Sequence, residues 1–349
     1  MQYARVRLLT IAATCLLALH GAAFASAPQP NANNLTARGL SLVWQDSLEK
    51  HVGEVPTAEV LYGPFGTFSE WHRLKSDATA DHRIVARAPD GRAAIQYNVA
   101  RGNVPHDETL SQHWTPGIRH AGLAVDVWIP VDFVFAYQCS ETSWLLHPGV
   151  GRWPIGLWIG SEASNRMSGG ISLAEQRGVS IRLNRGSGGD RAGQGASFGA
   201  YIYYLNRGRP RCEEDGVMCS PSCPQPDNPR ERCYGGGLAK KSGYTPRGRW
   251  VAVELEAKMN DPGKRNGCVA FWVDGALVDE GCGMDFGADR GWLIRGINTY
   301  QMWHCDGSPK DQAWWLSNIR LYTPSQAKGA GSAAPAPQRS PAGKAGKQQ

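Results

Sequence analysis

Two polar stretches, one on each side of a glycine-rich segment, combine residue types that can bind an anion and move a proton. Before the glycines, Ser180, Arg182 and Asn184 alternate with apolar residues, and after them Tyr201 and Tyr203 do the same. A guanidinium binds a carboxylate through two hydrogen bonds, and a phenol can donate or accept a proton. The pattern predicts that these polar side chains share one exposed surface that binds a polar, anionic ligand.

A period of two is the pattern of β-strands, so the residues that position these side chains are expected to form two strands of one sheet. Short runs of the same kind recur between residues 40 and 324, separated by Gly, Pro, Asn and Asp. Only residues 57–61 and 110–113 suggest helix. This organisation predicts an all-β sandwich or barrel. The further predicted strands are 41–44, 83–88, 93–97, 122–129, 133–137, 155–159, 249–258, 268–273, 277–280, 294–303 and 314–322.

The strand expected at residues 249–258 alternates apolar residues with Glu254 and Glu256, which we expect to face solvent in a half-solvated antiparallel strand. The next strand ends at Asp274-Gly275, a dipeptide that favours a two-residue hairpin turn. Such a turn places Cys268 and Cys282 nearly opposite each other, and we predict a disulfide between them.

The two ends of the chain differ from its middle. Basic residues followed by an apolar run and small residues predict a signal peptide over residues 1–26. A linker is expected over 27–39, one domain over 40–324, and a disordered basic tail over 325–349. The apolar run is short for a membrane span, so the mature protein is expected to be secreted or periplasmic and to lack a membrane span.

The formal net charge of +6 comes from the ends of the chain. Arg5 and Arg7 lie in the predicted signal, and four basic residues lie in the predicted tail, while neither segment carries an acidic residue. The remaining part is therefore neutral. This argues against nucleic acid as a partner, and it requires that anion binding rest on a few placed cations.

Eight cysteines follow the predicted signal, and four of them lie in a polar, proline-rich insertion at residues 206–248. An even number in an exported chain favours disulfides. The alternative is a zinc site within the insertion, but the spacing lacks a clean CxxC pair. We predict no metal and no cofactor for this protein, and we expect a monomer.

Several segments together resemble a known family. These are the run from Arg249 to Asp274-Gly275, the closing segment 311–321, and the segment 151–157 followed by Ser168-Gly169-Gly170. They resemble the β-jelly-roll polysaccharide lyases that include alginate and glucuronan lyases, polysaccharide lyase family 14 and its relatives. The resemblance spans about residues 120–324. It implies a concanavalin-like β-jelly-roll sandwich of two antiparallel sheets, here with the disulfide-rich loop insertion. The activity that it implies is cleavage of a polyuronate by β-elimination.

The resemblance also assigns roles to individual residues. The family's "SxR" matches Ser180 and Arg182, and its "YxY" matches Tyr201 and Tyr203. The lysine of its "GKLPGL" segment is replaced by Arg152, and this chain carries one extra residue there. The resemblance thus implies Tyr201, Tyr203 and Arg182 as catalytic residues. Ser180, Arg152 and Asn184 are the expected contacts to an acidic polysaccharide.

β-Elimination removes the proton next to a uronate carboxylate and expels the 4-linked sugar oxygen. A cation must hold the carboxylate, and Arg182 or Arg152 can supply it. An unperturbed tyrosine has a pKa near 10, so a tyrosine that acts as base near neutral pH needs a positive charge close by. Tyr201 and Tyr203 can divide the base and acid roles. Tyr201 is the preferred catalytic phenol, and the sequence does not decide which of the two is the base and which the acid.

Other readings of these residues stay open at the level of sequence. His120 and His147 are rival candidates for the base. A non-catalytic carbohydrate-binding jelly roll is the alternative function, favoured by the altered lysine motif. A glycoside hydrolase needs two acidic side chains across a groove, and the two central strands supply none.

Overall fold

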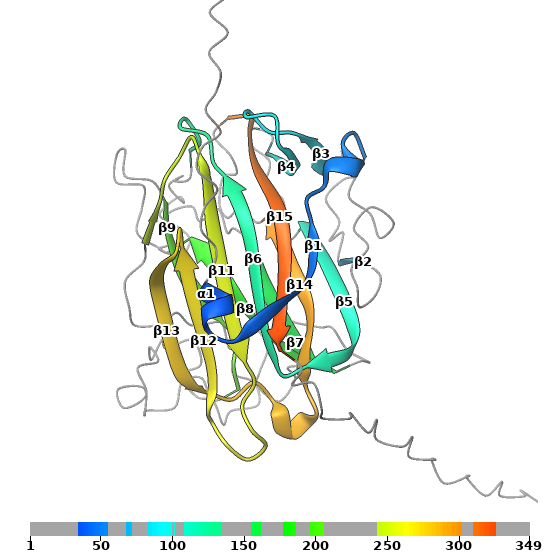
Figure 1. Cartoon of the computed structure of the whole chain (residues 1–349), viewed down its shortest axis with the longest axis vertical. Coiled ribbons are helices and arrows are strands. Elements are labelled where there is room, and N and C mark those ends of the chain that lie inside the picture. The colour runs from blue at the N-terminus through cyan, green and yellow to red at the C-terminus, as the bar shows by residue number, and fades with distance from the viewer. Residues whose placement is uncertain are drawn as a thin grey trace, which may run out of the picture.

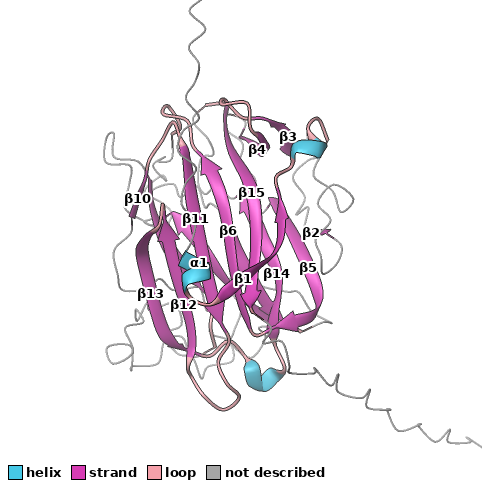
Figure 2. Ribbon diagram, viewed as in Figure 1, coloured by secondary structure: helices cyan, strands magenta, loops and turns pink. Residues whose placement is uncertain are grey.

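The computed structural model describes ten parts of the chain, and they are almost entirely β-strand (Figure 2). Two short 3-10 turns, at Glu49–His51 and Ala288–Arg290, and one helical turn, α1, complete the described elements. The described residues are 34–54, 68–71, 83–99, 101, 108–134, 155–161, 177–185, 196–205, 243–301 and 310–325.

These strands form two antiparallel sheets that pack face to face (Figure 1), which confirms the predicted all-β sandwich. One sheet has eight strands, and β1 (Leu40–Asp46) joins it by pairing with β15. In order across this sheet the other strands are β13 (Ala276–Met284), β12 (Gly267–Val273), β11 (Trp250–Lys258), β6 (His120–Trp128), β15 (Gln312–Pro324), β4 (Ala93–Val99) and β3 (Arg83–Arg87).

The second sheet has seven strands and contains both stretches that carry the predicted site. In order they are β10 (Gly243–Thr245), β9 (Ala196–Ile202), β8 (Gly178–Arg185), β7 (Ile155–Gly160), β14 (Leu293–Gln301), β5 (Glu108–Ile118) and β2 (Phe68–Trp71).

The core lies between the two sheets. Every second residue of the central strands is apolar and buried there, such as Val179 and Ile181 on β8 and Val253 and Leu255 on β11. Since alternate residues of a strand point to opposite faces, the side chains between them must lie on the outer faces of the sandwich. The two outer faces differ in what covers them.

Part of the outer face of the eight-stranded sheet is covered by the start of the described chain. Helix α1 (Asn34–Ala37) and β1 lie across the front of this sheet in Figure 1. Leu35 of α1 is fully buried, and a side chain at Gly122 of β6 would come within 2.7 Å of it. Residues 34–39, predicted as part of a linker, are therefore packed against the domain.

Glu254 and Glu256 of β11 are buried beneath this segment, so the prediction that they face solvent is wrong. Glu254 accepts a hydrogen bond from the Asn34 side chain at 2.6 Å, and Glu256 pairs with Arg38. Alternation along β11 correctly separates its two faces. It cannot reveal that another segment covers the second face.

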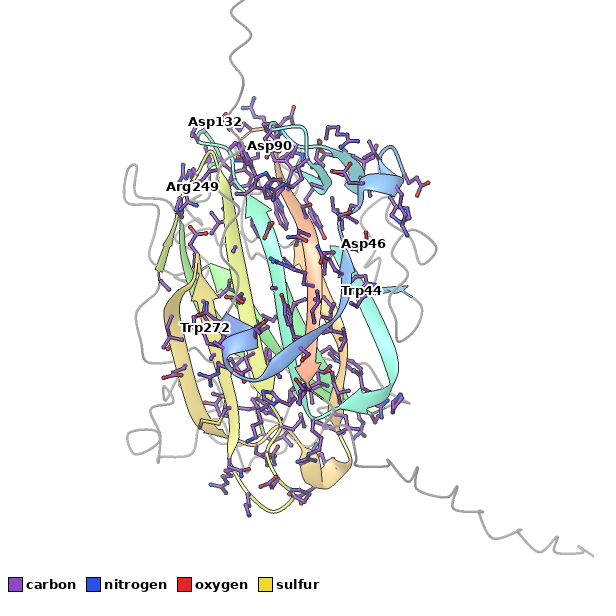
Figure 3. All side chains as sticks on the ribbon, in the orientation of Figure 1. Trp44, Asp46, Asp90, Asp132, Arg249 and Trp272 are labelled. Atoms are coloured by element: carbon purple, nitrogen blue, oxygen red, sulfur yellow. A yellow bond between two sulfur atoms is a disulfide. The ribbon has the colours of Figure 1, made fainter. Side chains whose placement is uncertain are left out.

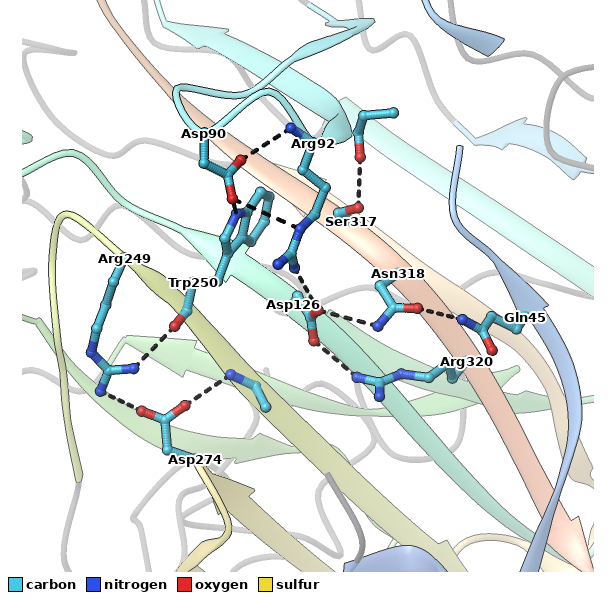
Figure 4. A network of polar contacts seen from close by, with 12 residues as sticks. Gln45, Asp90, Arg92, Asp126, Arg249, Trp250, Asp274, Ser317, Asn318 and Arg320 are labelled. Atoms are coloured by element: carbon cyan, nitrogen blue, oxygen red, sulfur yellow. Dashed lines mark hydrogen bonds and ion pairs between the residues drawn. The ribbon is translucent and has the colours of Figure 1, made fainter. Parts of the chain in front are cut away.

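A buried carboxylate joins three strands of the same sheet (Figure 4). Asp126 of β6 accepts hydrogen bonds from Arg92, which precedes β4, and from Arg320 of β15, both at 2.9 Å, and from Asn318 at 3.2 Å. Burial raises the pKa of the Asp126 carboxyl, while Arg320, Asn318 and Arg92 oppose that effect. Burying one carboxylate is tolerable here because two guanidinium groups and an amide pair with it.

The hairpin prediction is confirmed. Asp274 and Gly275 both have positive φ, of 49° and 80°, as the two-residue turn between β12 and β13 requires. The predicted disulfide between Cys268 and Cys282 is present across this hairpin.

Other predictions of secondary structure from the local pattern differ from the structure. Residues 110–113, which suggested helix, lie in β5, and the pairing of β5 with β14 and β2 overrides that local preference. Strands β2, β5 and β10 were not predicted. Residues 133 and 134 have no strand structure, although a strand was expected there, and they lie just after the turn that ends β6.

Several predictions fall on residues outside the described part: the signal peptide, residues 27–33 of the linker, almost all of the cysteine-rich insertion, the tail, and the helix at 57–61. Among the described residues, no helix is long and apolar enough to cross a membrane.

Leu35→Ala tests how firmly α1 is packed on the sheet. Removing a fully buried leucine side chain is expected to lower the free energy of unfolding by about 2–5 kcal/mol. The matched control is Leu42→Ala on β1, where the side chain is 48% exposed and a change within about 0.5 kcal/mol is expected. Urea unfolding followed by tryptophan fluorescence measures both, and equal losses in the two variants would contradict the packing of α1.

Glu254 should make stability depend on pH. Burial raises its pKa in the folded protein, so the folded state keeps the proton to higher pH than the unfolded chain. Stability supplied by this group is thus complete below its unfolded pKa, near 4.5, and is lost as the pH rises through the folded pKa. Glu254→Gln does not titrate at this position. Relative to this variant, the free energy of unfolding of the wild type should fall as the pH rises, by about 1.4 kcal/mol for each unit by which the folded pKa exceeds the unfolded pKa. Urea unfolding of both proteins at several pH values measures this difference in the free energy of unfolding. The account is refuted if the wild type gains stability relative to Glu254→Gln as the pH rises.

Candidate functional site

The seven-stranded sheet pairs the two predicted stretches as direct neighbours. In the β8–β9 register, Arg182 lies opposite Tyr201, and Leu183 lies opposite Ala200. Leu183, Ala200 and Ile202 belong to the core. Because alternate residues point to opposite faces, Arg182 and Tyr201 must lie together on the outer face of this sheet.

Tyr203 extends the same arrangement just beyond the end of β9. Its backbone N–H donates to the Ser180 carbonyl at 2.8 Å, which aligns it with Ser180. The Tyr201 and Tyr203 hydroxyls are 3.2 Å apart and share a hydrogen bond, and the two rings meet edge to face at 5.3 Å. The Arg182 guanidinium carbon lies over the Tyr203 ring, 5.5 Å from its centre. Ser180, Arg182, Tyr201 and Tyr203 therefore form one cluster, which we call the tyrosine cluster.

This cluster is less exposed than the sequence suggested. Arg182 and Tyr201 are half-buried, but Tyr203 is only 4% exposed and Ser180 is fully buried. The prediction of an exposed surface is thus wrong for these last two residues. The Tyr203 ring contacts both the Tyr201 ring and the guanidinium of Arg182. Of the two phenols, Tyr201 is the more accessible from solvent.

The Ser180 hydroxyl oxygen is buried and makes no hydrogen bond to any residue that the structure describes. A buried hydroxyl without a partner costs about 1–3 kcal/mol, so proteins seldom retain one without a reason. The hydroxyl lies on the same face as Arg182 and two residues from it along β8. A ligand that reaches this part of the cluster can supply the missing partner.

Cross-strand register extends the cluster into two rows of residues across the sheet. The first row continues from Arg182 through Gly156 of β7 to Asn298 of β14 and Ser111 of β5. The second continues from Ser180 through Trp158 of β7 to Gly296 of β14 and His113 of β5.

Gly156 has a specific steric role in the first row. A Cβ atom at this position would lie 2.7 Å from the Ile181 carbonyl oxygen and 3.2 Å from the Arg182 Cγ. The absence of a side chain at Gly156 therefore leaves room for the first carbon atoms of the Arg182 side chain. Any larger residue has to displace either the β8 backbone or that arginine.

Sequence analysis missed the positions that other strands add to the two rows. Asn298, His113 and Trp158 are far from residues 178–205 in the chain, and only strand pairing aligns them with the tyrosine cluster. Thr109, Ser111 and His113 do alternate along β5, and this was the signal available. This alternation falls on residues 110–113, where the local pattern predicts helix.

The remaining candidates are distributed differently. Asn184 lies two residues beyond Arg182 on β8 and pairs with Gly199, and Arg152 and His147 are outside the described residues. His120 donates to or accepts from Glu256 at 2.7 Å on the outer face of the other sheet, so it is not part of the tyrosine cluster. No group of three or more metal-ligating side chains occurs among the described residues.

Comparison with known proteins supports the fold but not a family assignment by sequence. No protein-family model and no curated protein matches this chain. The marine PL-14 alginate lyase from Aplysia kurodai matches it with a TM-score of 0.56 at 17% identity, over 81% of this chain and 100% of that one. A variant of alginate lyase Aly36B in complex with alginate tetrasaccharide matches with a TM-score of 0.53 at 14% identity, over 80% and 97%. The sandwich is therefore a β-jelly roll of the kind found in these alginate lyases, as the sequence resemblance implied.

Ser180→Ala tests whether the hydroxyl is held without a partner. Because it removes a buried, unsatisfied group, the free energy of unfolding is expected to stay the same or to rise by up to about 3 kcal/mol. The matched control is Ser317→Ala, which removes a buried hydroxyl that donates to the Ala93 carbonyl at 2.6 Å and should cost about 1 kcal/mol or more. Equal destabilisation of the two variants in urea unfolding would contradict this account.

Proposed function

We propose that this protein is an exported polysaccharide lyase that cleaves a uronic-acid-containing polysaccharide by β-elimination at the tyrosine cluster. The observation that carries the proposal is the contact of Arg182 with a hydrogen-bonded pair of tyrosines on one face of the sheet. Its support is twofold: the fold matches that of alginate lyases, and the four residues match the family's motifs. Export rests on the predicted signal peptide over residues 1–26.

Arg182 has the chemistry needed to bind and activate a uronate. Deprotonation next to a carboxylate builds negative charge on that group, and an adjacent guanidinium stabilises this charge in the transition state. Arginine keeps its positive charge at any working pH and can bind both carboxylate oxygens. The Ser180 hydroxyl can add a further hydrogen bond in the same region, which would satisfy its buried oxygen.

Tyr201 is the proposed base. It is the more accessible of the two phenols, and it lies directly opposite Arg182. As phenolate it takes the proton from C5 of the uronate. The electron pair of that C–H bond forms the C4–C5 double bond, the C4–O bond breaks, and the departing oxygen takes up a proton.

Tyr203 can assist that proton transfer through its hydroxyl. Its oxygen is 3.2 Å from that of Tyr201, so one proton can be shared or passed between the two phenols. This arrangement allows the pair to accept a proton from C5 and to deliver one toward the leaving oxygen. Tyr203 is buried, so we assign it to holding and relaying the proton rather than to direct contact with C5.

Binding without cleavage is the second candidate function. The observation that favours it is Arg152, which stands where the resembled motif has a lysine. Hydrolysis has less support, because it requires two carboxyl groups across the ligand, and the two described rows contain no aspartate or glutamate.

The proposed reaction creates a double bond that absorbs ultraviolet light. The mature protein is expected to increase this absorbance with alginate or glucuronan, and Tyr201→Phe is expected to lower the rate about 10²–10⁴-fold because it removes the base. Arg182→Ala should lower it by a comparable factor.

Tyr322→Phe serves as the matched control, because Tyr322 is a buried tyrosine on the outer face of the other sheet and should leave the rate unchanged. Oligosaccharide binding without new absorbance would favour the binding function. New reducing ends without absorbance would indicate hydrolysis, and full activity of Tyr201→Phe would exclude Tyr201 as the base.

A further inference from the structure

Three tryptophans form a row on the outer face of the eight-stranded sheet. Trp250 of β11 pairs with Trp128 of β6, which pairs in turn with Trp315 of β15. The alternate residues Val251, Val127 and Leu316 are in the core, so the three indoles must lie on the opposite face. The chain thus places three indoles side by side on adjacent strands, and we call them the tryptophan row.

The row is buried at Trp250 and half-buried at Trp128 and Trp315. Trp250 is only 3% exposed: Trp128 meets its ring edge to face at 5.7 Å, and the Arg92 guanidinium lies 4.5 Å from its centre. Its indole N–H donates to Asp90 at 2.7 Å. Trp128 and Trp315 pack against this anchor but are only half-buried.

Amide groups continue the row beyond Trp315. Gln96 of β4 lies opposite Trp315 and accepts a hydrogen bond from its indole N–H at 3.2 Å. The Gln96 amide donates in turn to Asn98 at 2.6 Å. Both amides are half-buried. Flat aromatic faces are therefore followed directly by groups that both donate and accept hydrogen bonds.

The charges near the row are paired within the protein. Arg92 bonds to Asp126, and Arg249, just before Trp250, pairs with Asp274 at 2.5 Å (Figure 4). Asp90, Asp132 and Arg249 lie at the same end of the sandwich (Figure 3), and Asp132 pairs with Lys310 at 2.5 Å. The charged side chains named here are thus paired within the protein.

We propose that the tryptophan row is a second carbohydrate-binding site, which holds an extended polysaccharide by the apolar faces of its pyranose rings. Indoles offer flat apolar area with a polar edge, and the amides of Gln96 and Asn98 match sugar hydroxyls. Neighbouring strands are about 4.8 Å apart, close to the length of one pyranose unit in an extended 1,4-linked chain. Trp128 and Trp315, the two half-buried indoles, lie on adjacent strands and are thus placed to contact neighbouring sugars, while Trp250 supports them from beneath the surface.

This site is separate from the proposed catalytic one. The tryptophan row lies on the outer face of one sheet and the tyrosine cluster on the outer face of the other, with the whole core between them. The row therefore binds a second chain or a distant part of a long one. Its effect is to hold the protein on the polymer and raise the local concentration of cleavable chain.

Because the charges are paired, recognition at the row depends on sugar faces and not on carboxylates. The probes are accordingly cellohexaose, which is neutral and 1,4-linked, and an alginate hexasaccharide. Wild-type protein is expected to bind cellohexaose with little change between low and high salt. Trp128→Ala/Trp315→Ala should bind it roughly tenfold or more weakly, since two stacking contacts are lost. Titration calorimetry measures both, with the indole N–H resonances locating the ligand.

Three controls keep the result specific. Trp128→Phe/Trp315→Phe should fold and retain part of the binding, because it keeps aromatic faces. Trp44→Ala changes a half-buried tryptophan of β1 outside the row and should bind like the wild type. Arg182→Ala should leave cellohexaose binding unchanged while abolishing cleavage, so failure of the catalytic proposal is recognised separately.

Three results would overturn the proposal. One is that the wild type binds neither hexasaccharide at a site that shifts the indole resonances of the row. Another is that the double alanine variant, shown to be folded, binds cellohexaose as tightly as the wild type. The third is that the wild type self-associates and the double variant does not, which would identify the row as a protein interface.

Discussion

The division of each strand into a core face and an outer face is the constraint on which the rest of this structure depends. Apolar residues at every second position of β6, β11, β7 and β8 fix which face of each sheet meets the other, because a shift of one residue would bury the polar set. Once this is fixed, the outer faces receive all the residues that can do chemistry. Pairing between strands then aligns them into rows, including the tyrosine cluster and the tryptophan row.

The two outer faces differ in how their buried polar groups are paired. On the eight-stranded sheet, buried carboxylates are matched by partners from distant parts of the chain: Asp126 by two arginines and an asparagine, and Glu254 by the side chain of Asn34. These contacts connect the strands of the sheet to one another and to α1. On the seven-stranded sheet, the tyrosine cluster keeps a guanidinium beside two phenols and a buried hydroxyl without a partner.

This difference gives the two proposed sites different kinds of specificity. In the proposed function, the tyrosine cluster selects a charged sugar, because Arg182 binds a carboxylate and β-elimination needs that carboxylate held. The tryptophan row selects a shape, because indole faces and amides contact rings and hydroxyls irrespective of charge. A domain whose charges sum to zero could in this way bind an acidic polymer through one local cation and remain on it through uncharged contacts at the opposite face.

The sequence alone determined the period of the strands, the all-β sandwich, the Asp274-Gly275 turn with its Cys268–Cys282 disulfide, and the alternation that places Arg182 and Tyr201 on one face. These features follow from local patterns, because strand alternation and turn geometry depend on residues that are close together in the sequence. Only the tertiary structure decided which strands are neighbours, and hence that the two phenols share a hydrogen bond, that Ser180 is buried, and that Trp128, Trp250 and Trp315 form a row. It also decided that α1 covers Glu254. The reason is physical: pairing and burial depend on contacts between segments far apart in the chain, and alternation within one strand carries no information about what lies beside or above it.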